Sequence, residues 1–142
     1  MKRSVFWIKR GLLMILLLTL AACVSSSSQS NDPLEGTNWQ LIFYRKTTVI
    51  DDTHITTNFE NGEITGSAGC NSYFGAYQVD GQDLTIGQLG MTEMYCMEPE
   101  GLMEQESTYL EYLADAQSYE ITDGRLIIFL SGQETLTFEP AE

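Results

Sequence analysis

The 142-residue chain carries a formal charge of −13, from 20 acidic and 7 basic residues. Four of the basic residues and none of the acidic ones precede Cys23, so residues 23–142 hold three basic and 20 acidic side chains, a formal charge of −17. Such a chain repels nucleic acid and anionic membrane surfaces, which excludes a nucleic-acid-binding function. Solubility is the ordinary reason for this acidity, and a specific basic partner is the alternative.

Residues 1–22 have the order of a secretory signal. Four basic residues within residues 1–10 form a positive region, the apolar run GLLMILLLTL follows, and Ala21 and Ala22 precede Cys23. The uncharged stretch 11–22 is shorter than the ~20 residues that a membrane-spanning helix needs. We therefore expect residues 1–22 to be a signal peptide that is removed from the mature protein.

The sequence Leu20-Ala21-Ala22-Cys23 resembles the bacterial lipobox, in which small residues precede an acylated cysteine. This resemblance implies that Cys23 is lipidated, with palmitate among its acyl chains, and several chains anchor a protein stably in a membrane. An ordinary signal peptide with an accidental cysteine is the alternative. Val24, not aspartate, follows the cysteine, and in a Gram-negative organism the resemblance points to the periplasmic face of the outer membrane.

Residues 23–33 are Ser-rich and lack aromatic side chains, which predicts a flexible tether after the lipidated cysteine. The remaining residues, 34–142, are enough for one domain with a single hydrophobic core.

Most of this domain has the pattern of short strands, with β-branched and aromatic residues between turn residues. Asn61-Gly62 and Asp123-Gly124 predict hairpins with type I′ turns. Asp80-Gly81 and Ser131-Gly132 separate the strands of two further hairpins. The expected strands are residues 37–45, 55–60, 63–67, 72–79, 83–87, 118–122, 125–130 and 134–139.

Residues 100–117 have a different pattern, which predicts a helix. Pro99 suits the first turn, and acidic residues near the start, Glu106 among them, complement the helix dipole. The residues at helical spacing are Leu102, Glu106, Tyr109, Leu110, Leu113 and Ala116. Together the elements predict a mainly β, β-rich α+β fold: a small, partly open antiparallel β-barrel of about eight strands with one inserted helix.

With Cys23 acylated, Cys70 and Cys96 remain, an even number in an oxidising compartment, and we expect them to form one disulfide. Closing the segment 70–96 would contribute about 3.5 kcal/mol in the chain-entropy model. That is a large share of the 5 to 15 kcal/mol, roughly, that stabilises a typical domain.

The segment GSAGCNSYFGAY at 66–77, with DLTIGQLG and MTEMYC after it, resembles the META/HslJ domain family. The opening LEGTNWQL and the later YLEYL, LIIFL and LTF also resemble the family, so the likeness extends over nearly all of residues 34–138. The resemblance implies a β-rich cracked barrel with a helix, some likeness to a secretion-system pilot lipoprotein, and a heat-inducible envelope lipoprotein. It carries over no established catalytic residues.

We interpret the residues that match the family motif as structural. Glycines that bracket a strand mark a bulge, a bend or a close backbone approach, and a phosphate cradle is excluded because no helix and no lysine follow. Asn71 can bond its own backbone and hold a turn, with ligand binding as the alternative. The motif residues are Gly36, Thr37, Trp39, Gly66, Gly69, Asn71, Tyr73, Gly75, Tyr77, Thr92 and Met94.

The segment MTEMYCM at 91–97 is rich in sulfur. Met91, Met94, Cys96 and Met97 are soft donors suited to Cu(I). Methionine is also a common filler of irregular gaps and packs well against aromatic rings. We expect these methionines to pack around the disulfide, and keep a Cu(I) site and redox sensing as alternatives.

No catalytic group can be assembled from the sequence, because His54 is the only histidine and lies in an acidic, loop-like stretch. We therefore expect a protein that is not an enzyme and needs no cofactor. Its barrel and helix would bind an envelope protein or a hydrophobic or peptide ligand near the membrane. A Cu(I)-binding protein and a purely structural stress-response lipoprotein are the alternatives.

Overall fold

The computed structural model describes residues 32–141, so the predicted signal peptide, Cys23 and most of the predicted tether lie outside the described residues. None of the helical segments in this range has the length and apolar character needed to cross a membrane. The elements are strands β1 Thr37–Tyr44, β2 Thr47–Thr48, β3 Thr56–Glu60, β4 Glu63–Ser67, β5 Ser72–Asp80, β6 Asp83–Ile86, β7 Gly90–Met91, β8 Ala116–Thr122, β9 Arg125–Leu130 and β10 Thr135–Pro140, helix α1 Leu102–Ala114, and a 3-10 turn η1 Ser131–Gln133.

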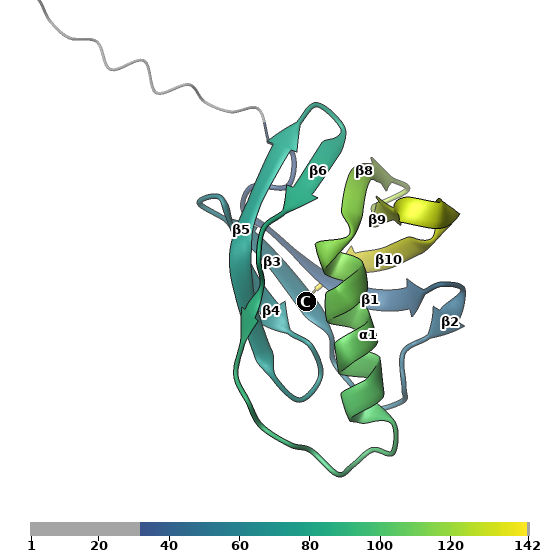
Figure 1. Ribbon diagram of the computed structural model, residues 1–142. Helices are drawn as coiled ribbons and strands as arrows, with labels where there is room; N and C mark the ends of the chain where they lie inside the picture. The colour runs from purple at the N-terminus through teal and green to yellow at the C-terminus, as the bar shows by residue number, and fades with distance from the viewer. Residues whose placement is uncertain (1–31, 142) are drawn as a thin grey trace, which may run out of the picture. The chain divides into compact units, whose positions relative to one another are not determined.

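Eight of the strands form a closed antiparallel barrel with the helix lying against it (Figure 1). Hydrogen bonds join them in the order β1-β3-β4-β5-β6-β8-β9-β10, and β10 pairs with β1 again. The short strand β2 pairs with β1 and the short strand β7 with β5, and the sequence pattern predicts neither. The predicted mainly β fold, a barrel of about eight strands with one inserted helix, is confirmed.

The barrel is least tightly paired where β6 meets β8. The registered pairing there is the single pair Asp83 and Ser118, and the Tyr119 amide donates to the Gln82 carbonyl at 2.9 Å. Strand β6 has only four residues, so it cannot pair along the whole of β8. The partial opening that we expected is therefore confined to this seam of a closed barrel, and helix α1 contacts β6 beside it.

The four predicted hairpins are all present. Asn61 and Gly62 have φ angles of 55° and 75°, and Asp123 and Gly124 have 51° and 73°. A type I′ turn needs two successive residues with positive φ, which these residue types supply at low cost. The other two hairpins join β5 to β6 and β9 to β10.

Helix α1 is shorter than the predicted 100–117. The Leu102 amide donates to the Pro99 carbonyl at 3.1 Å, and Gly101 has a φ of 84°, so the regular helix begins only at Leu102. At the other end Ala116, which fits the helical spacing, is the first residue of β8 and is buried there. An apolar residue that fits the spacing of a helix can thus be buried in the same core when it belongs to a strand.

The helix packs on the barrel through a face whose residues recur every three or four positions. Its buried residues are Leu102, Gln105, Glu106, Tyr109 and Leu113. Gln105 is buried with partners: its Oε1 accepts from the Ile50 amide at 2.7 Å, and its Nε2 donates to the Thr53 hydroxyl at 3.1 Å. These bonds attach the segment between β2 and β3 to the helix.

Three hydroxyl groups meet in the core. The Thr57 hydroxyl lies 2.8 Å from that of Tyr73 and 2.7 Å from that of Tyr109, and the two tyrosine hydroxyls are 2.8 Å apart. Tyr73 also hydrogen-bonds to the Thr56 carbonyl. Burial raises the pKa of Tyr109 to about 12 and the pKa of Tyr73 well above its usual range, because a phenolate there would lose its hydration.

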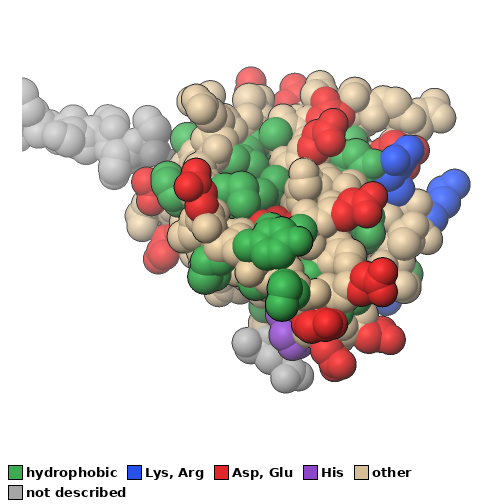
Figure 2. Space-filling view, turned by 60° about the horizontal axis from the view of Figure 1, so that its bottom comes forward, with side chains coloured by type: hydrophobic (Ala, Val, Ile, Leu, Met, Phe, Trp, Pro, Cys, Tyr) green, Lys and Arg blue, Asp and Glu red, His purple; other side chains and the backbone are tan. Residues whose placement is uncertain are grey.

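The surface of the domain is predominantly acidic. Figure 2 shows Asp and Glu side chains over most of the visible face, whereas Lys and Arg side chains are confined to one side of it. Within residues 32–141 the one ion pair joins Arg45 to Glu134, with an N–O distance of 3.5 Å. Most carboxylates of this part of the chain therefore have no cationic partner in the protein itself.

Tyr73 and Tyr109, whose hydroxyl groups meet in the core, predict a loss of stability in alkaline solution. Below about pH 10 their phenols are neutral in both the folded and the unfolded chain, so the stability due to their burial is fully present. Above that pH the unfolded chain ionises first, and the free energy of unfolding falls by about 1.4 kcal/mol per pH unit for each tyrosine until the folded pKa is passed. Tyr109→Phe should remove the contribution of one tyrosine to this decrease between about pH 10 and pH 12. Urea unfolding at a series of pH values measures the change.

Tyr95→Phe is the matched control, because the Tyr95 side chain is exposed, and its slope should equal that of the unsubstituted protein. An unchanged slope for Tyr109→Phe would contradict the burial of this hydroxyl.

Candidate functional site around the disulfide

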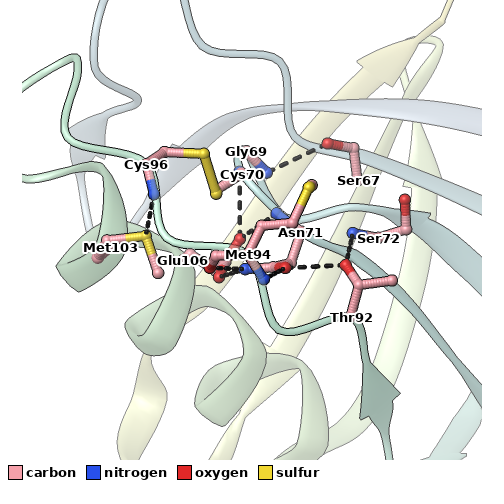
Figure 3. Close-up of a disulfide and its surroundings, with 10 residues drawn as sticks. All are labelled: Ser67, Gly69, Cys70, Asn71, Ser72, Thr92, Met94, Cys96, Met103 and Glu106. Atoms are coloured by element: carbon pink, nitrogen blue, oxygen red, sulfur yellow. Dashed lines mark hydrogen bonds between the residues drawn. A yellow bond between two sulfur atoms is a disulfide. The ribbon is translucent and has the colours of Figure 1, made fainter.

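Cys70 and Cys96 form a disulfide with an S–S distance of 2.06 Å (Figure 3). Cys70 lies just before β5, and Cys96 lies in the segment 92–101 between β7 and α1, which we call the β7–α1 loop. This loop has no regular secondary structure of its own. The predicted bridge is therefore present, and it attaches the loop to the barrel.

Asn71 holds the same loop by hydrogen bonds. Its Oδ1 accepts from the Met94 amide at 2.7 Å and from the Thr92 hydroxyl at 2.8 Å, and its Nδ2 donates to the Met94 carbonyl at 3.1 Å. The side chain is 1% exposed. Asn71 does not make the local turn that its residue type suggested; its side chain joins the start of β5 to a loop more than 20 residues away.

Glu106 on helix α1 completes this arrangement. Its Oε2 accepts from the amides of Cys70 and Asn71 at 3.1 and 2.6 Å, and its Oε1 accepts from Asn71 Nδ2 at 2.7 Å. The residue is 1% exposed, and three donors compensate for the loss of water around its carboxylate. From the sequence we expected Glu106 to complement the helix dipole and to lie at the helical spacing of the apolar face, but not to have a buried partner. An acidic residue in line with an apolar face was the signal of that partner.

Close backbone approach explains the motif glycines. A Cβ on Gly66 would lie 1.9 Å from the Thr56 carbonyl oxygen, and a Cβ on Gly75 would lie 3.1 Å from that of Gln88. Gly69 has a φ of 116°, a conformation that side chains rarely allow. The neighbouring strand excludes a side chain at Gly66, the backbone conformation strains one at Gly69, and one at Gly75 would require Leu89 and the Gln88 backbone to shift.

The remaining motif residues hold the start of the domain. Gly36 has a φ of 75°, and its amide donates to the Phe59 carbonyl at 2.7 Å. The Thr37 hydroxyl donates to the Leu34 carbonyl and accepts from the Trp39 indole nitrogen at 2.8 Å. This short segment is thereby fixed across the end of β3.

Tyr77, in the second half of β5, fixes the first described residues. Its hydroxyl donates to the carboxylates of Asp32 and Glu35 at 2.8 and 3.0 Å. Burial and then the two carboxylates raise the pKa of Tyr77. The described chain thus begins at one end of the barrel, and the β7–α1 loop lies at the opposite end (Figure 1).

Large apolar side chains are exposed around the β7–α1 loop. Of the eight exposed large hydrophobic residues among those described, five belong to this region, and we call them the apolar cluster: Phe74, Met91, Met94, Tyr95 and Met97. Figure 2 shows hydrophobic side chains gathered on this face among acidic ones. The Phe74 ring lies over Gly90, where a Cβ would come within 2.6 Å of it, so the cluster continues from β5 onto β7.

The expectation that the three methionines of the segment 91–97 pack around the disulfide is wrong. Met91, Met94 and Met97 are 42%, 55% and 79% exposed. Met103, on helix α1, is partly buried, and its sulfur accepts from the Cys96 amide at 3.5 Å. Because the Cys96 sulfur is bonded to Cys70, the donor set considered for Cu(I) lacks its thiolate while the bridge is closed. Among residues 32–141 no three His, Cys, Asp or Glu side chains lie together where they could hold a metal ion.

His54 is exposed, as expected for a loop histidine. It borders an open hollow of about 530 Å³ on the outside of the barrel, which is lined by Gln40, His54, Thr56, Glu139, Pro140 and Ala141. No serine or cysteine lines this hollow, so it does not place a nucleophile of those kinds beside the imidazole.

The buried carboxylate predicts that Glu106→Gln destabilises the protein. One acceptor oxygen becomes an NH₂ group that faces the Asn71 amide donor, which should lower the free energy of unfolding by about 2 to 3 kcal/mol. Glu111→Gln, at an exposed position of the same helix, should change it by less than about 0.5 kcal/mol. Urea unfolding under non-reducing conditions measures both, and equal midpoints for the two variants would contradict the role assigned to Glu106.

Comparison with known proteins agrees with the resemblance seen in the motifs. The model of the META domain family matches residues 32–142. The chain is 27% identical to the heat shock protein HslJ of Escherichia coli (strain K12) over 133 residues, which cover 88% of this chain and 90% of that protein.

Solved structures share the fold. An NMR structure of a protein from Burkholderia xenovorans is 28% identical, with a TM-score of 0.62, over 76% of this chain and 83% of that one. A second NMR structure is 27% identical, with a TM-score of 0.61, over 75% and 91% of the two chains. A crystal structure of a DUF4847 family protein from Bacteroides vulgatus, 15% identical with a TM-score of 0.54 over 75% of this chain and 93% of that one, shows likeness of fold alone. Since the family model covers most of its length, this chain belongs to the META domain family.

Proposed function

We propose that this chain is a lipid-anchored protein of the cell envelope whose META domain binds a partner protein and catalyses no reaction. The anchor would be Cys23, at the end of the lipobox-like sequence Leu20-Ala21-Ala22-Cys23. In a Gram-negative cell the protein would face the periplasm from the outer membrane. A role in envelope stress is supported by the name of its relative, a heat shock protein.

The apolar cluster is the observation that carries this proposal. Contiguous exposed apolar surface in a water-soluble domain marks an interaction site, and tyrosine and methionine are enriched at protein interfaces. The β7–α1 loop that bears most of the cluster is held by the disulfide and by the Asn71 hydrogen bonds to Met94. A surface that is already ordered loses little entropy when a partner binds.

The filled interior favours a partner on the outer surface over a ligand inside the barrel. Phe59, Tyr73, Tyr109 and Phe138 are at most 1% exposed, and the three-hydroxyl cluster occupies the space between β3, β5 and the helix. A ligand in the barrel would have to displace these side chains and leave their hydroxyl groups without partners.

Site-specific photo-crosslinking in intact cells tests the binding surface. A photoreactive residue in place of Tyr95, which is 79% exposed, should yield a discrete crosslinked species. The same residue in place of Ile121, an exposed apolar residue of β8, is the matched control and should yield none. The proposal fails if position 95 gives no crosslinked protein, or the same products as position 121.

Cell fractionation tests the anchor. The unsubstituted protein should sediment with membranes and carry acyl mass at Cys23, whereas Cys23→Ser should lose that mass and leave the membrane fraction. Ser25→Ala changes the same segment without touching the cysteine and should behave as the unsubstituted protein does. Membrane attachment of Cys23→Ser would contradict the lipid anchor.

A further inference from the structure

We infer that the apolar cluster receives a basic stretch of another envelope protein, in which lysine or arginine side chains flank apolar ones. This inference rests on the proposed function above and adds the chemistry of the partner. Its support is the charge that surrounds the cluster and the place of the cluster in the domain.

Acidic side chains alternate with the apolar ones along the β7–α1 loop. Glu93, Glu98 and Glu100 are exposed, and none of them has a hydrogen-bonding or ion-pair partner within residues 32–141. The loop itself contains no basic residue. A partner that brings cations to these carboxylates gains both apolar burial and charge complementarity.

The basic residues of the domain lie elsewhere. Arg45 and Lys46 lie between β1 and β2, and Arg125 begins β9. Arg45 is already engaged, by the ion pair with Glu134 and by a position 5.5 Å from the centre of the Tyr112 ring. The cluster therefore has no cationic neighbour on its own loop, and Tyr95 presents an open ring on which a lysine or arginine of the partner could stack.

A second copy of the chain fits this surface poorly. A two-fold contact would bring the same three carboxylates of two molecules together, and like charges at an interface cost binding free energy. The charge of this surface thus favours a partner that differs from the chain itself.

A lipid surface also fits poorly. The described chain begins at Asp32, which is held by Tyr77 in β5, and the cluster lies around the start of this strand (Figure 1). Tyr77 comes five residues after Ser72, so at about 3.3 Å per residue the two lie roughly 17 Å apart. The acidic rim of the cluster repels anionic headgroups.

The test uses two charge variants of the full-length protein. The loop variant combines Glu93→Gln, Glu98→Gln and Glu100→Gln. The control variant combines Glu60→Gln, Glu63→Gln and Asp83→Asn, exposed residues of the β3–β4 and β5–β6 hairpins at the opposite end of the barrel. Both raise the net charge by the same amount, so only the position of the lost charges differs.

Photo-crosslinking from position 95 in intact cells is the first readout. The loop variant should capture the partner about tenfold less than the unsubstituted protein, and the control variant should capture as much as the unsubstituted protein does. Mass spectrometry of the crosslinked peptide should find lysine or arginine flanking apolar residues. Undiminished capture by the loop variant, or an acidic crosslinked peptide, would overturn the basic-partner inference.

A further variant separates this inference from the proposed function. Met94→Gln combined with Met97→Gln removes apolar surface and keeps the carboxylates. If this variant loses capture while the loop variant keeps full capture, the apolar cluster is a binding surface but its partner is not basic. Full capture in all variants would reject both.

Purified protein in neutral detergent gives the second readout. A labelled peptide of alternating lysine and leucine pairs should bind at least tenfold more tightly than a peptide in which glutamate replaces lysine. Added salt should weaken the binding of the lysine peptide. The loop variant should lose this preference and the control variant should keep it. Equal binding of both peptides, self-association in sedimentation, or binding of Cys23→Ser protein to phosphatidylglycerol vesicles in place of the peptide would overturn the inference.

Discussion

The Glu106 carboxylate is the contact on which the other features of this end of the molecule depend. It is buried, and a buried charge is tolerated only when donors replace its water. Those donors come from Cys70 and Asn71 at the start of β5, while Asn71 in turn holds Met94 in the β7–α1 loop. Helix, barrel and loop therefore cannot be positioned independently. The disulfide adds a covalent connection between the start of β5 and the β7–α1 loop.

Motif residues in and just before strand β5 make three separate sets of contacts. In its second half, Tyr77 donates to the carboxylates of Asp32 and Glu35 at the start of the described chain. Towards its start, Tyr73 joins the hydroxyl cluster that links β3, β5 and helix α1. Before its first residue, Asn71 fixes the loop that bears the apolar cluster. The first described residues and the exposed surface are thus held by different parts of one strand.

The local part of this architecture could be predicted from the sequence. Asn61-Gly62 and Asp123-Gly124 predict type I′ turns because few residue types accept two successive positive φ angles. Alternating apolar residues likewise predict the long strands. Strand β7 could not be predicted, since its two residues pair through backbone groups that leave no trace in residue type. The end of α1 at Ala114 could not be predicted either, because Ala116 fits the helical spacing but is buried as the first residue of β8.

The site could be predicted less well, because its contacts are long-range. The motif identifies Asn71, Thr92 and Met94, but not that the Asn71 side chain joins the other two. Glu106 lies 35 residues from Asn71 and looks like an ordinary helix-start acid. The exposed methionines were misassigned because methionine occurs both in cores and at interfaces, so the residue type does not predict burial. The exposure of Met94 depends on the bonds of its backbone to Asn71, which is distant in sequence.

Hydrogen exchange of the Met94 amide tests most directly whether the apolar cluster lies on a fixed surface. This amide belongs to a loop without regular secondary structure, so only its bond to Asn71 Oδ1 would protect it. We predict slow exchange in the oxidised native protein, comparable with amides of β5, and fast exchange after Glu106→Gln. Fast exchange at Met94 in the unsubstituted protein would show that the loop is not held, and would contradict the account of a preformed binding surface.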